Sequence, residues 1–461
     1  MSNKKSEEIL TTKNTVFYSL AGVADVMSYQ MFSFYIFNFY AAVKQLHIWW
    51  ATLGYIIWSI WNAINDPLLG SLSDRTSSKW GRRKPWIVGS LIPLFILIIL
   101  LWTPPAGPEI AIFVYFLIII NLFDTFYTMY SLNQTSLFPE MYTDLQQRTE
   151  ANNLVQIFNI IGLLVATILP SLFVTSFDDP ASAPDYLMAG IVAAILALII
   201  AIIFIKFGIN ERKEYQKDAY EAPSLIQSIK FTFKNKSFST YILTNLAVWF
   251  VFGLIPIINP YFLKYIIGIE DALIQQLLLA TIFISAIIFM GFWRKYFAKK
   301  GARTAELHVL LVLILTLIPF IFIWEIVGAI VSYIIVGFGF AGIMFGRDVM
   351  MSTIIDADEI ETGLRREGSY YGVNALIIRL STIFVVLSIA TVFDTVGWEV
   401  YDPSNVTIFT LIGIRMLMCA FPALALILGY ISLRRFPLTK EKYEEIKVKL
   451  DKLHGEKKET V

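Results

Sequence analysis

Asn62-Ala-Ile-Asn65-Asp66-Pro67-Leu-Leu-Gly70-Ser-Leu-Ser-Asp74-Arg75, continuing through Trp80-Gly81-Arg82-Arg83-Lys84-Pro85-Trp86, is the stretch of sequence that most strongly indicates the fold. It places one carboxylate, Asp66, inside an apolar segment and ends that segment in a dense basic turn. A charge at membrane depth costs roughly 3 kcal/mol on insertion scales, so it is usually there to meet an ion, a substrate or an opposite charge. The basic turn predicts which side of the membrane this end faces.

Composition predicts a polytopic membrane protein. Hydrophobic residues make up 57% of the 461 positions and charged residues only 16%, which lies outside the usual balance of a soluble domain. The basic residues form short clusters between apolar runs, so we expect no nucleic-acid partner. The chain has one cysteine, Cys419, and three scattered histidines. We therefore expect no disulfide framework, no cofactor, no metal site and no enzymatic activity.

Apolar runs of about twenty residues, each long enough to cross a bilayer, predict an all-α membrane protein with twelve spans. The runs lie at 16–42, 49–73, 86–103, 110–137, 151–176, 186–208, 238–264, 272–294, 305–323, 326–355, 370–394 and 406–433. A polar connection at 210–236 divides them into two sets of six, the layout of a transporter built from two parallel halves.

These runs predict a domain order along the chain. We expect an N-terminal segment at 1–15, a six-helix bundle at 16–208, a linker at 209–237, a second six-helix bundle at 238–433 and a tail at 434–461. The basic, amphipathic segment at 223–238 should lie on the inner leaflet. The tail is rich in lysine and glutamate and is typical of a solvated helix or a disordered end.

Lysine and arginine predict the topology. Alternate connections are rich in them, from the Asp74–Arg83 turn onward, whereas the opposite connections contain only Lys44 and Lys264. By the positive-inside rule the rich side is cytoplasmic, and an even number of spans places both termini there, in the cell membrane. No cleavable signal precedes the first run, so we expect that span to be retained.

Charged residues within the spans predict a shared polar cavity. At a rise of about 1.5 Å per residue, Asp25, Asp66, Asp348 and Arg379 converge at roughly 12 to 18 Å from the cytoplasmic ends of four different spans. They cannot face lipid cheaply, so they should line one cavity or pair across it. Asp25 either accepts hydrogen bonds from a substrate or pairs with Arg379. Arg347 either snorkels to a gate or lines the cavity.

The second span presents an all-oxygen nest. Asn62, Asn65 and Asp66 are three and four residues apart and share a helix face, which suits a hard monovalent cation or a proton on Asp66. Pro67 frees a backbone carbonyl nearby. The alternative is that Asp66 only caps or pairs with a neighbouring helix. The fourth span carries a polar series that includes Tyr127, Thr128 and Ser131 and that must face protein or water.

Several motifs resemble a known family. Gly70-Ser-Leu-Ser-Asp74-Arg75 with Gly81-Arg82-Arg83 resembles the signature of the major facilitator superfamily. Asn65-Asp66-Pro67, the Trp80–Trp86 stretch, Phe138-Pro139-Glu140-Met141 and Asp356-Ala-Asp358-Glu359 are similar to one branch, the glycoside-pentoside-hexuronide:cation symporters, to which the melibiose carrier belongs. Together these motifs touch both halves of the chain.

The resemblance implies site residues. A cation site would comprise Asp66, Asn62, Asn65 and Thr128, with Asn62 standing where the melibiose carrier has a second aspartate. For the substrate, the resemblance implies Asp25, Ser131 and Arg379, and the polar residues of the predicted cavity add Tyr127 and Asp348. Ser131 stands where the carrier has a sugar-binding aspartate, and Arg379 stands where it has a lysine. Independently of the resemblance, charge pairing on the cytoplasmic side predicts a gate that comprises Asp74, Arg75, Arg82, Arg83, Arg148, Arg365 and Arg366, although these arginines could also be topology signals alone.

The implied function is cation-coupled symport of a small polar solute, a sugar or glycoside, by alternating access in a monomeric carrier. A carrier of lysophospholipid-like amphiphiles and an uncoupled facilitator remain alternatives. The partners would be the substrate, the lipid bilayer and a monovalent cation, either a proton or sodium. With Asn62 in place of a second carboxylate, we expect a proton to be used at least as readily as sodium.

Overall fold

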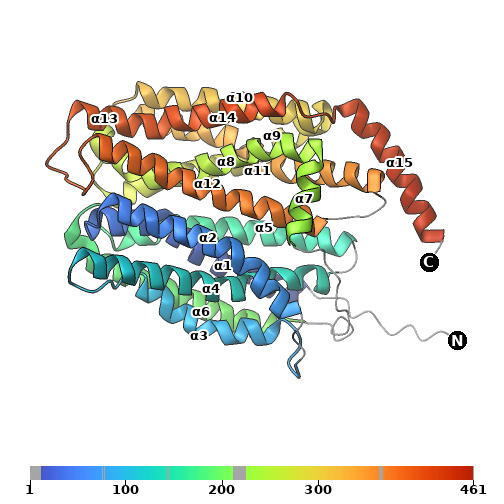
Figure 1. The fold of residues 1–461 in the computed structure, drawn as a ribbon, viewed down its shortest axis with the longest axis horizontal. Helices are drawn as coiled ribbons and strands as arrows, with labels where there is room; N and C mark the ends of the chain where they lie inside the picture. The colour runs from blue at the N-terminus through green and yellow to red at the C-terminus, as the bar shows by residue number, and fades with distance from the viewer. Residues whose placement is uncertain are drawn as a thin grey trace. The chain divides into compact units, whose positions relative to one another are not determined.

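The computed structural model describes residues 12–74, 76, 78–142, 145–210, 225–362 and 367–459. Every regular element within those ranges is a helix (Figure 1). Contacts divide the chain into two compact units, the first formed by residues 1–44 and 64–221 and the second by 45–63 and 222–461. The division falls within one helix, α2 (Ile48–Asp74). Its residues up to Ala63 belong to the second unit, and those from Ile64 onward belong to the first.

The first unit is a helical bundle that also contains α1 (Thr12–Asn38), α3 (Lys84–Leu100), α4 (Glu109–Met141), α5 (Leu145–Ile168) and α6 (Ala183–Phe207). Helix α1 packs against α5 and α6, and α3 packs against α4 and α6. The close approach of α6 to the end of α3 requires glycine at position 190, because a Cβ there would lie 2.2 Å from the Trp102 ring.

The second unit repeats this arrangement. It contains α8 (Lys236–Phe262), α9 (Ala272–Lys300), α10 (Ala302–Leu317), α11 (Ile326–Thr362), α12 (Glu367–Thr395), and a last rod made of α13 (Ile408–Arg415), a π-helical turn (Met416–Ala420) and α14 (Phe421–Leu433). Helix α11 packs along α9, and α8 packs against α12 and α14. A Cβ at Gly337 of α11 would lie 1.7 Å from the Ser285 hydroxyl on α9, so the absence of a side chain permits this contact.

The helices confirm the predicted all-α membrane fold. Nine helical stretches of the described chain are long and apolar enough to cross a bilayer, and they coincide with nine of the predicted runs. The other three runs correspond to α1, α2 and α3. Helix α3 has only 17 residues, whereas α1 and α2 have 27 each but carry more polar side chains. Helices α1 and α2, which are long but less apolar than the other spans, both carry candidate site residues.

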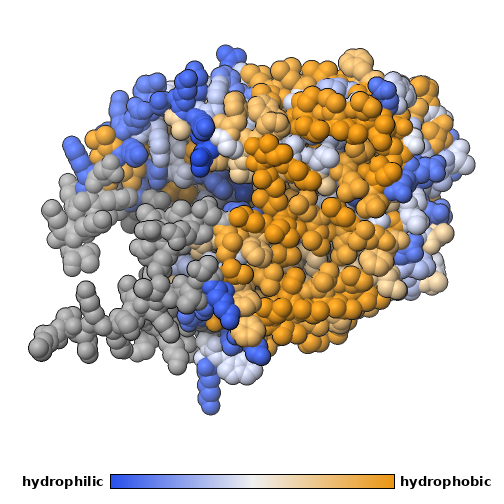
Figure 2. Space-filling view, turned by 180° about the vertical axis from the view of Figure 1, so that it is seen from behind, coloured by the Kyte–Doolittle hydropathy of each residue, from blue (hydrophilic) through white to orange (hydrophobic). Residues whose placement is uncertain are grey.

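The surface of the helices is suited to lipid. Exposed apolar side chains recur along α9, including Ile284, Ile287 and Ile288, the last of which is 71% exposed. Figure 2 shows apolar side chains over much of the drawn face, with hydrophilic side chains set apart from them. This is the distribution that a polytopic membrane protein needs, because lipid tails cannot solvate polar groups.

Two segments expected to interact with the leaflet or with solvent also pack on protein. Helix α7 (Leu225–Lys234) contacts α12 and α8, and Asn235, just after it, donates a 2.8 Å hydrogen bond to the Tyr370 hydroxyl. The tail forms α15 (Lys440–Glu459), which packs against α11. The Tyr443 hydroxyl donates a 2.7 Å hydrogen bond to Asp356 at the end of α11. The tail is therefore helical but, at its start, docked.

Candidate functional site

An oxygen-rich cluster joins α2 to α4 within the first unit. Thr128 donates a 3.0 Å hydrogen bond from its hydroxyl to Asp66 Oδ1. One residue earlier on α2, the Asn65 side-chain amide donates to Asp124 Oδ2 at 3.1 Å and to the Asp124 carbonyl at 3.3 Å. Asn65 and Asp124 are fully buried, and Asn65 Oδ1 has no hydrogen-bond partner among the described residues. The two hydrogen-bonded pairs place two carboxylates and a buried amide oxygen together.

Helical spacing explains the cluster. Asp124 and Thr128 are four residues apart on α4, so they lie one turn apart on the same face. Asn65 and Asp66 are consecutive on α2 and meet those two positions in turn. Pro67 lies inside α2 and has no N–H to donate to the carbonyl of Ala63, which leaves a further backbone oxygen near this level.

Asn62 takes part in a different contact, within the second unit. Its side-chain carbonyl accepts a hydrogen bond from Nε of Arg379 on α12. Asn62 is buried, at 1% exposure. The structure thus brings the predicted cation-site residues Asn65, Asp66 and Thr128 together, and gives Asn62 a guanidinium partner. The positive charge of the guanidinium beside that oxygen makes the oxygen a poor ligand for a cation.

A second polar cluster of the first unit surrounds Asp25 on α1. The side chains of Tyr127 and Ser131 on α4 lie near its carboxylate. The Tyr127 ring also stacks on Tyr29, with ring centroids 4.9 Å apart. The structure thus brings together three of the predicted substrate residues. Tyr127 and Ser131 lie one turn apart on α4, and Asp25 lies near them on α1.

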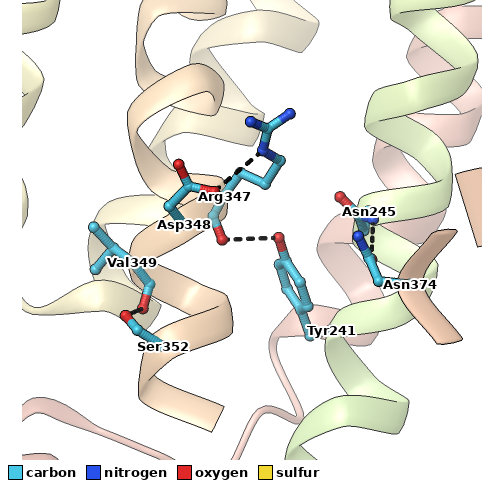
Figure 3. Close-up of polar contacts among 7 residues, drawn as sticks. All are labelled: Tyr241, Asn245, Arg347, Asp348, Val349, Ser352 and Asn374. Carbon is cyan, nitrogen blue, oxygen red and sulfur yellow. Dashed lines mark hydrogen bonds and ion pairs between the residues drawn. The ribbon is translucent and has the colours of Figure 1, made fainter. Parts of the chain in front are cut away.

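The second unit has its own polar cluster, drawn in Figure 3. Arg347 and Asp348 are neighbours on α11, and Arg347 Nε lies 3.5 Å from Asp348 Oδ1. The Tyr241 hydroxyl on α8 donates to the Arg347 carbonyl at 3.4 Å. Asn245, one turn further along α8, donates to Asn374 of α12 at 2.5 Å. Asp348 is 64% exposed in its side chain, so its carboxylate is open to a ligand.

An aromatic ring completes this cluster. The Arg347 guanidinium lies over the Trp249 ring, 5.6 Å from its centroid. The indole Nε1 of Trp249 is buried and has no hydrogen-bond partner among the described residues. The attraction between the guanidinium and the face of the indole ring holds the guanidinium in place. The composition of one carboxylate, one guanidinium, two amides and an indole is suited to a hydroxylated ring.

Only part of the predicted gate can be placed. The side chains of Asp74, Arg75, Arg148, Arg365 and Arg366 lie outside the described residues. Arg83 is 6% exposed, and its guanidinium donates a 2.7 Å hydrogen bond to the Ser73 hydroxyl at the end of α2. Arg82, next to it, also has a contacting partner. The turn between α2 and α3 is therefore tied to the end of α2.

Asp124 and Glu306 are buried carboxylates to which the sequence alone assigns no role. Asp124 is one of several polar residues on α4, and its spacing does not single it out. Glu306 on α10 is 2% exposed, and its Oε2 has no partner among the described residues. A Cβ at Gly346 of α11 would lie 2.0 Å from that oxygen, so the glycine makes room for the carboxyl group.

Comparison with known proteins finds similarity over nearly the whole chain. The family profile described as MFS/sugar transport protein matches residues 17–440. An uncharacterized symporter of Synechocystis is 23% identical, covering 98% of each chain. The isoprimeverose transporter of Lactiplantibacillus pentosus is 22% identical over 76% of this chain and 73% of its own. The human sodium-dependent lysophosphatidylcholine symporter 1 is 24% identical over 86% of this chain and 78% of its own.

Among solved structures, the inward-open xylose transporter of E. coli superposes with a TM-score of 0.65 at 14% sequence identity. The match covers 94% of this chain and 98% of that one. At that identity the likeness concerns the fold alone.

Proposed function

The chain belongs to the MFS/sugar transport protein family of the major facilitator superfamily, a family of symporters, and from that premise we propose a specific transport activity. It is a multi-pass membrane protein and a transporter. We propose that it moves a small polar solute, a sugar or glycoside, together with a monovalent cation. Both termini would lie in the cytoplasm, as the lysine and arginine pattern predicts.

The observation that carries this proposal is the cluster on α2 and α4. Hard cations take oxygen ligands, and the cluster supplies carboxylate, amide and hydroxyl oxygens at Asp66, Asp124, Asn65 and Thr128. Asp124 adds a second negative charge that Asn62 does not provide. This weakens the expectation that a single carboxylate would favour a proton at this site, and a sodium ion fits the cluster.

Coupling follows from the charges. A conformation that encloses Asp66 and Asp124 without a cation would desolvate two negative charges, which is costly in a membrane interior. A bound cation removes part of that cost, so cation binding favours the closed states through which transport proceeds. By linkage, a substrate that favours the same states raises the affinity for the cation.

Substrate contacts would come from groups that can bond hydroxyls. In the second unit, Arg379 and Asp348 are such groups. The Trp249 ring is a flat apolar surface of the kind that sugar rings stack on. The isoprimeverose transporter supports a sugar. The lysophosphatidylcholine symporters match at least as much of this chain, which supports an amphiphile as the second candidate.

A thermal-shift screen tests the proposal. Purified full-length protein would be heated with single sugars, glycosides and lysolipids, in sodium and in choline buffers. A ligand that binds the native state raises the unfolding midpoint. We expect a sugar or glycoside to stabilise the protein more in sodium than in choline. Stabilisation by lysolipids alone would favour the second candidate, and equal stabilisation in both salts would exclude sodium as the coupling ion and leave a proton-coupled carrier or an uncoupled facilitator.

A further inference from the structure

Helix α7 (Leu225–Lys234) differs in direction from the spanning helices of its unit. In Figure 1 it runs across the direction of α8 and α12, and it contacts both of them. Only Asn235 separates α7 from the first residue of α8, Lys236. A helix that lies crosswise where a span begins is oriented to lie in the plane of the membrane surface.

The two faces of α7 have different surroundings. At 3.6 residues per turn, Thr232 lies on the side of the helix opposite Lys230, Phe233 and Lys234. Thr232 is fully buried, and the ring of its neighbour Phe231 lies 6.4 Å from the ring of Tyr370 on α12. Lys230 and Lys234 are exposed, and Phe233 is 44% exposed. One face of α7 is therefore held by protein, and the other is open.

The open face combines positive charge with an aromatic ring. Lys230, Lys234 and Lys236 are all exposed, and none of them has an ion-pair partner among the residues that the structure describes. The Phe233 ring lies 6.0 Å from that of Phe238, in the first turn of α8, so it lies at the level where this span begins. Lysines beside an interfacial aromatic ring are suited to anionic lipid headgroups.

Asn235 joins the end of α7 to two spanning helices. Its Oδ1 accepts hydrogen bonds from the backbone N–H groups of Ser237 at 2.9 Å and Phe238 at 3.1 Å, which caps α8. Its Nδ2 donates a 2.8 Å hydrogen bond to the Tyr370 hydroxyl on α12. Helix α12 also carries Arg379, one of the proposed substrate contacts. Ordering of α7 can therefore reach the start of α12 through one side chain.

We propose that α7 is a binding site for an anionic phospholipid of the cytoplasmic leaflet, and that the bound lipid orders the start of α12. Lys230, Lys234 and Lys236 hold the headgroup phosphate, and Phe233 contacts the upper part of the acyl chains. A lipid is favoured over an acidic protein because α7 lies crosswise at the level where α8 begins. The site goes beyond the proposed transport activity, since it depends on neither the solute nor the coupling ion.

Hydrogen exchange in lipid nanodiscs tests the proposal on the full-length protein. The discs would contain either phosphatidylcholine alone or an equal mixture of phosphatidylcholine and phosphatidylglycerol, and the readout is amide exchange at residues 225–240. We expect slower exchange in the anionic discs. Equal exchange of the wild-type protein in the two compositions would overturn the proposal, because the site would then have no preference for an anionic headgroup.

A triple variant, Lys230→Gln with Lys234→Gln and Lys236→Gln, tests the lysines. Each lysine near an anionic surface strengthens attachment about fivefold, so loss of all three should weaken it about a hundredfold. The difference in exchange between the two kinds of disc should then disappear. A difference that persists at residues 225–240 in this variant would refute the assignment of the site to these lysines.

The matched control removes the same charge from the tail. Lys442, Lys447 and Lys449 are exposed positions of α15, and their joint replacement by glutamine should leave the lipid-dependent exchange of α7 unchanged. Loss of the effect in this control as well would show that it follows net charge and not the α7 site, which would also overturn the proposal.

Tyr370→Phe tests the connection to α12. The substitution removes the hydroxyl that accepts from Asn235 and leaves the cap on α8 in place. In the wild-type protein we expect anionic discs to slow exchange at residues 367–378 as well as in α7. In Tyr370→Phe the effect should remain in α7 and be lost from α12. Equal slowing of α12 in both proteins would refute the connection. Failure of the sugar screen would leave all these results unaffected.

Discussion

Replacement of Asp124 by asparagine is the sharpest test of the cation cluster. The substitution keeps the shape of a side chain that is fully buried and bonded to the Asn65 amide. It removes one negative charge and leaves Asp66 and Thr128 in place. The variant therefore separates the contribution of the second carboxylate from that of the fold.

The size of the effect follows from Coulomb's law. A carboxylate about 6 Å from a bound ion contributes about 3 kcal/mol at an effective dielectric constant of about 20. That is roughly a hundredfold in Kd. Loss of only a neutral oxygen ligand would have a much smaller effect. We therefore expect Asp124→Asn to weaken sodium binding by about two orders of magnitude.

Sodium titration by isothermal calorimetry, in choline-balanced buffer at constant ionic strength, measures that change. The control is Asp185→Asn, which removes a carboxylate from the first turn of α6. It should leave the sodium affinity unchanged. A sodium Kd within threefold of wild type in folded Asp124→Asn would show that Asp124 is neutral or distant from the ion, and the cluster would lose its second charge.

Three further outcomes are expected. Asp66→Asn should abolish cation-driven accumulation in proteoliposomes, because an amide supplies no net charge; full gradient-driven uptake would exclude Asp66 from coupling. Arg379→Ala should reduce uptake more than Arg379→Lys, since lysine retains the charge but cannot reproduce the donor that bonds Asn62; equal uptake by the two variants would mean that Arg379 is only structural. Tyr443→Phe removes the hydrogen bond to Asp356, worth about 1 to 2 kcal/mol, and should speed hydrogen exchange in α15; unchanged exchange would argue against docking through this contact.

The spans could be predicted from the sequence because one physical requirement dominates them. A run must be apolar and long enough for the bilayer, and this condition needs no knowledge of the partner helix. The second predicted run, 49–73, differs from α2 (Ile48–Asp74) by one residue at each end. The last run, 406–433, is interrupted in the structure by a π-helical turn, which hydropathy cannot detect.

The membership of the cation cluster was harder to predict, because it depends on which helix lies opposite. Asn62, Asn65 and Asp66 share a helix face by their spacing, which groups them in the sequence without reference to the opposite helix. In the structure Asn65 and Asp66 meet α4, whereas Asn62 meets Arg379, which is 317 residues away in sequence. Asp124 belongs to the cluster for the same reason, since its bond with Asn65 depends on α4 lying beside this part of α2.

The docked tail shows a related limit. Its lysines and glutamates predict a solvated helix, and most of its surface is indeed charged. Specific contacts hold its start. They include the Tyr443 hydrogen bond to Asp356 and the approach of Lys440 to Gly301, where an added Cβ would lie 2.7 Å from the lysine Cβ. Single contacts of this kind leave no periodic pattern in a sequence.

The carboxyl group of Glu306 bears on how the protein is made. Helix α10 reaches the membrane insertion machinery before α11, so Glu306 at first has no Gly346 against which to pack. A lone acidic side chain makes insertion of a helix less favourable. We expect α10 to wait at the machinery until α11 has been synthesised, and the two helices to enter the lipid as a hairpin. The order of synthesis would then matter as much as the final packing.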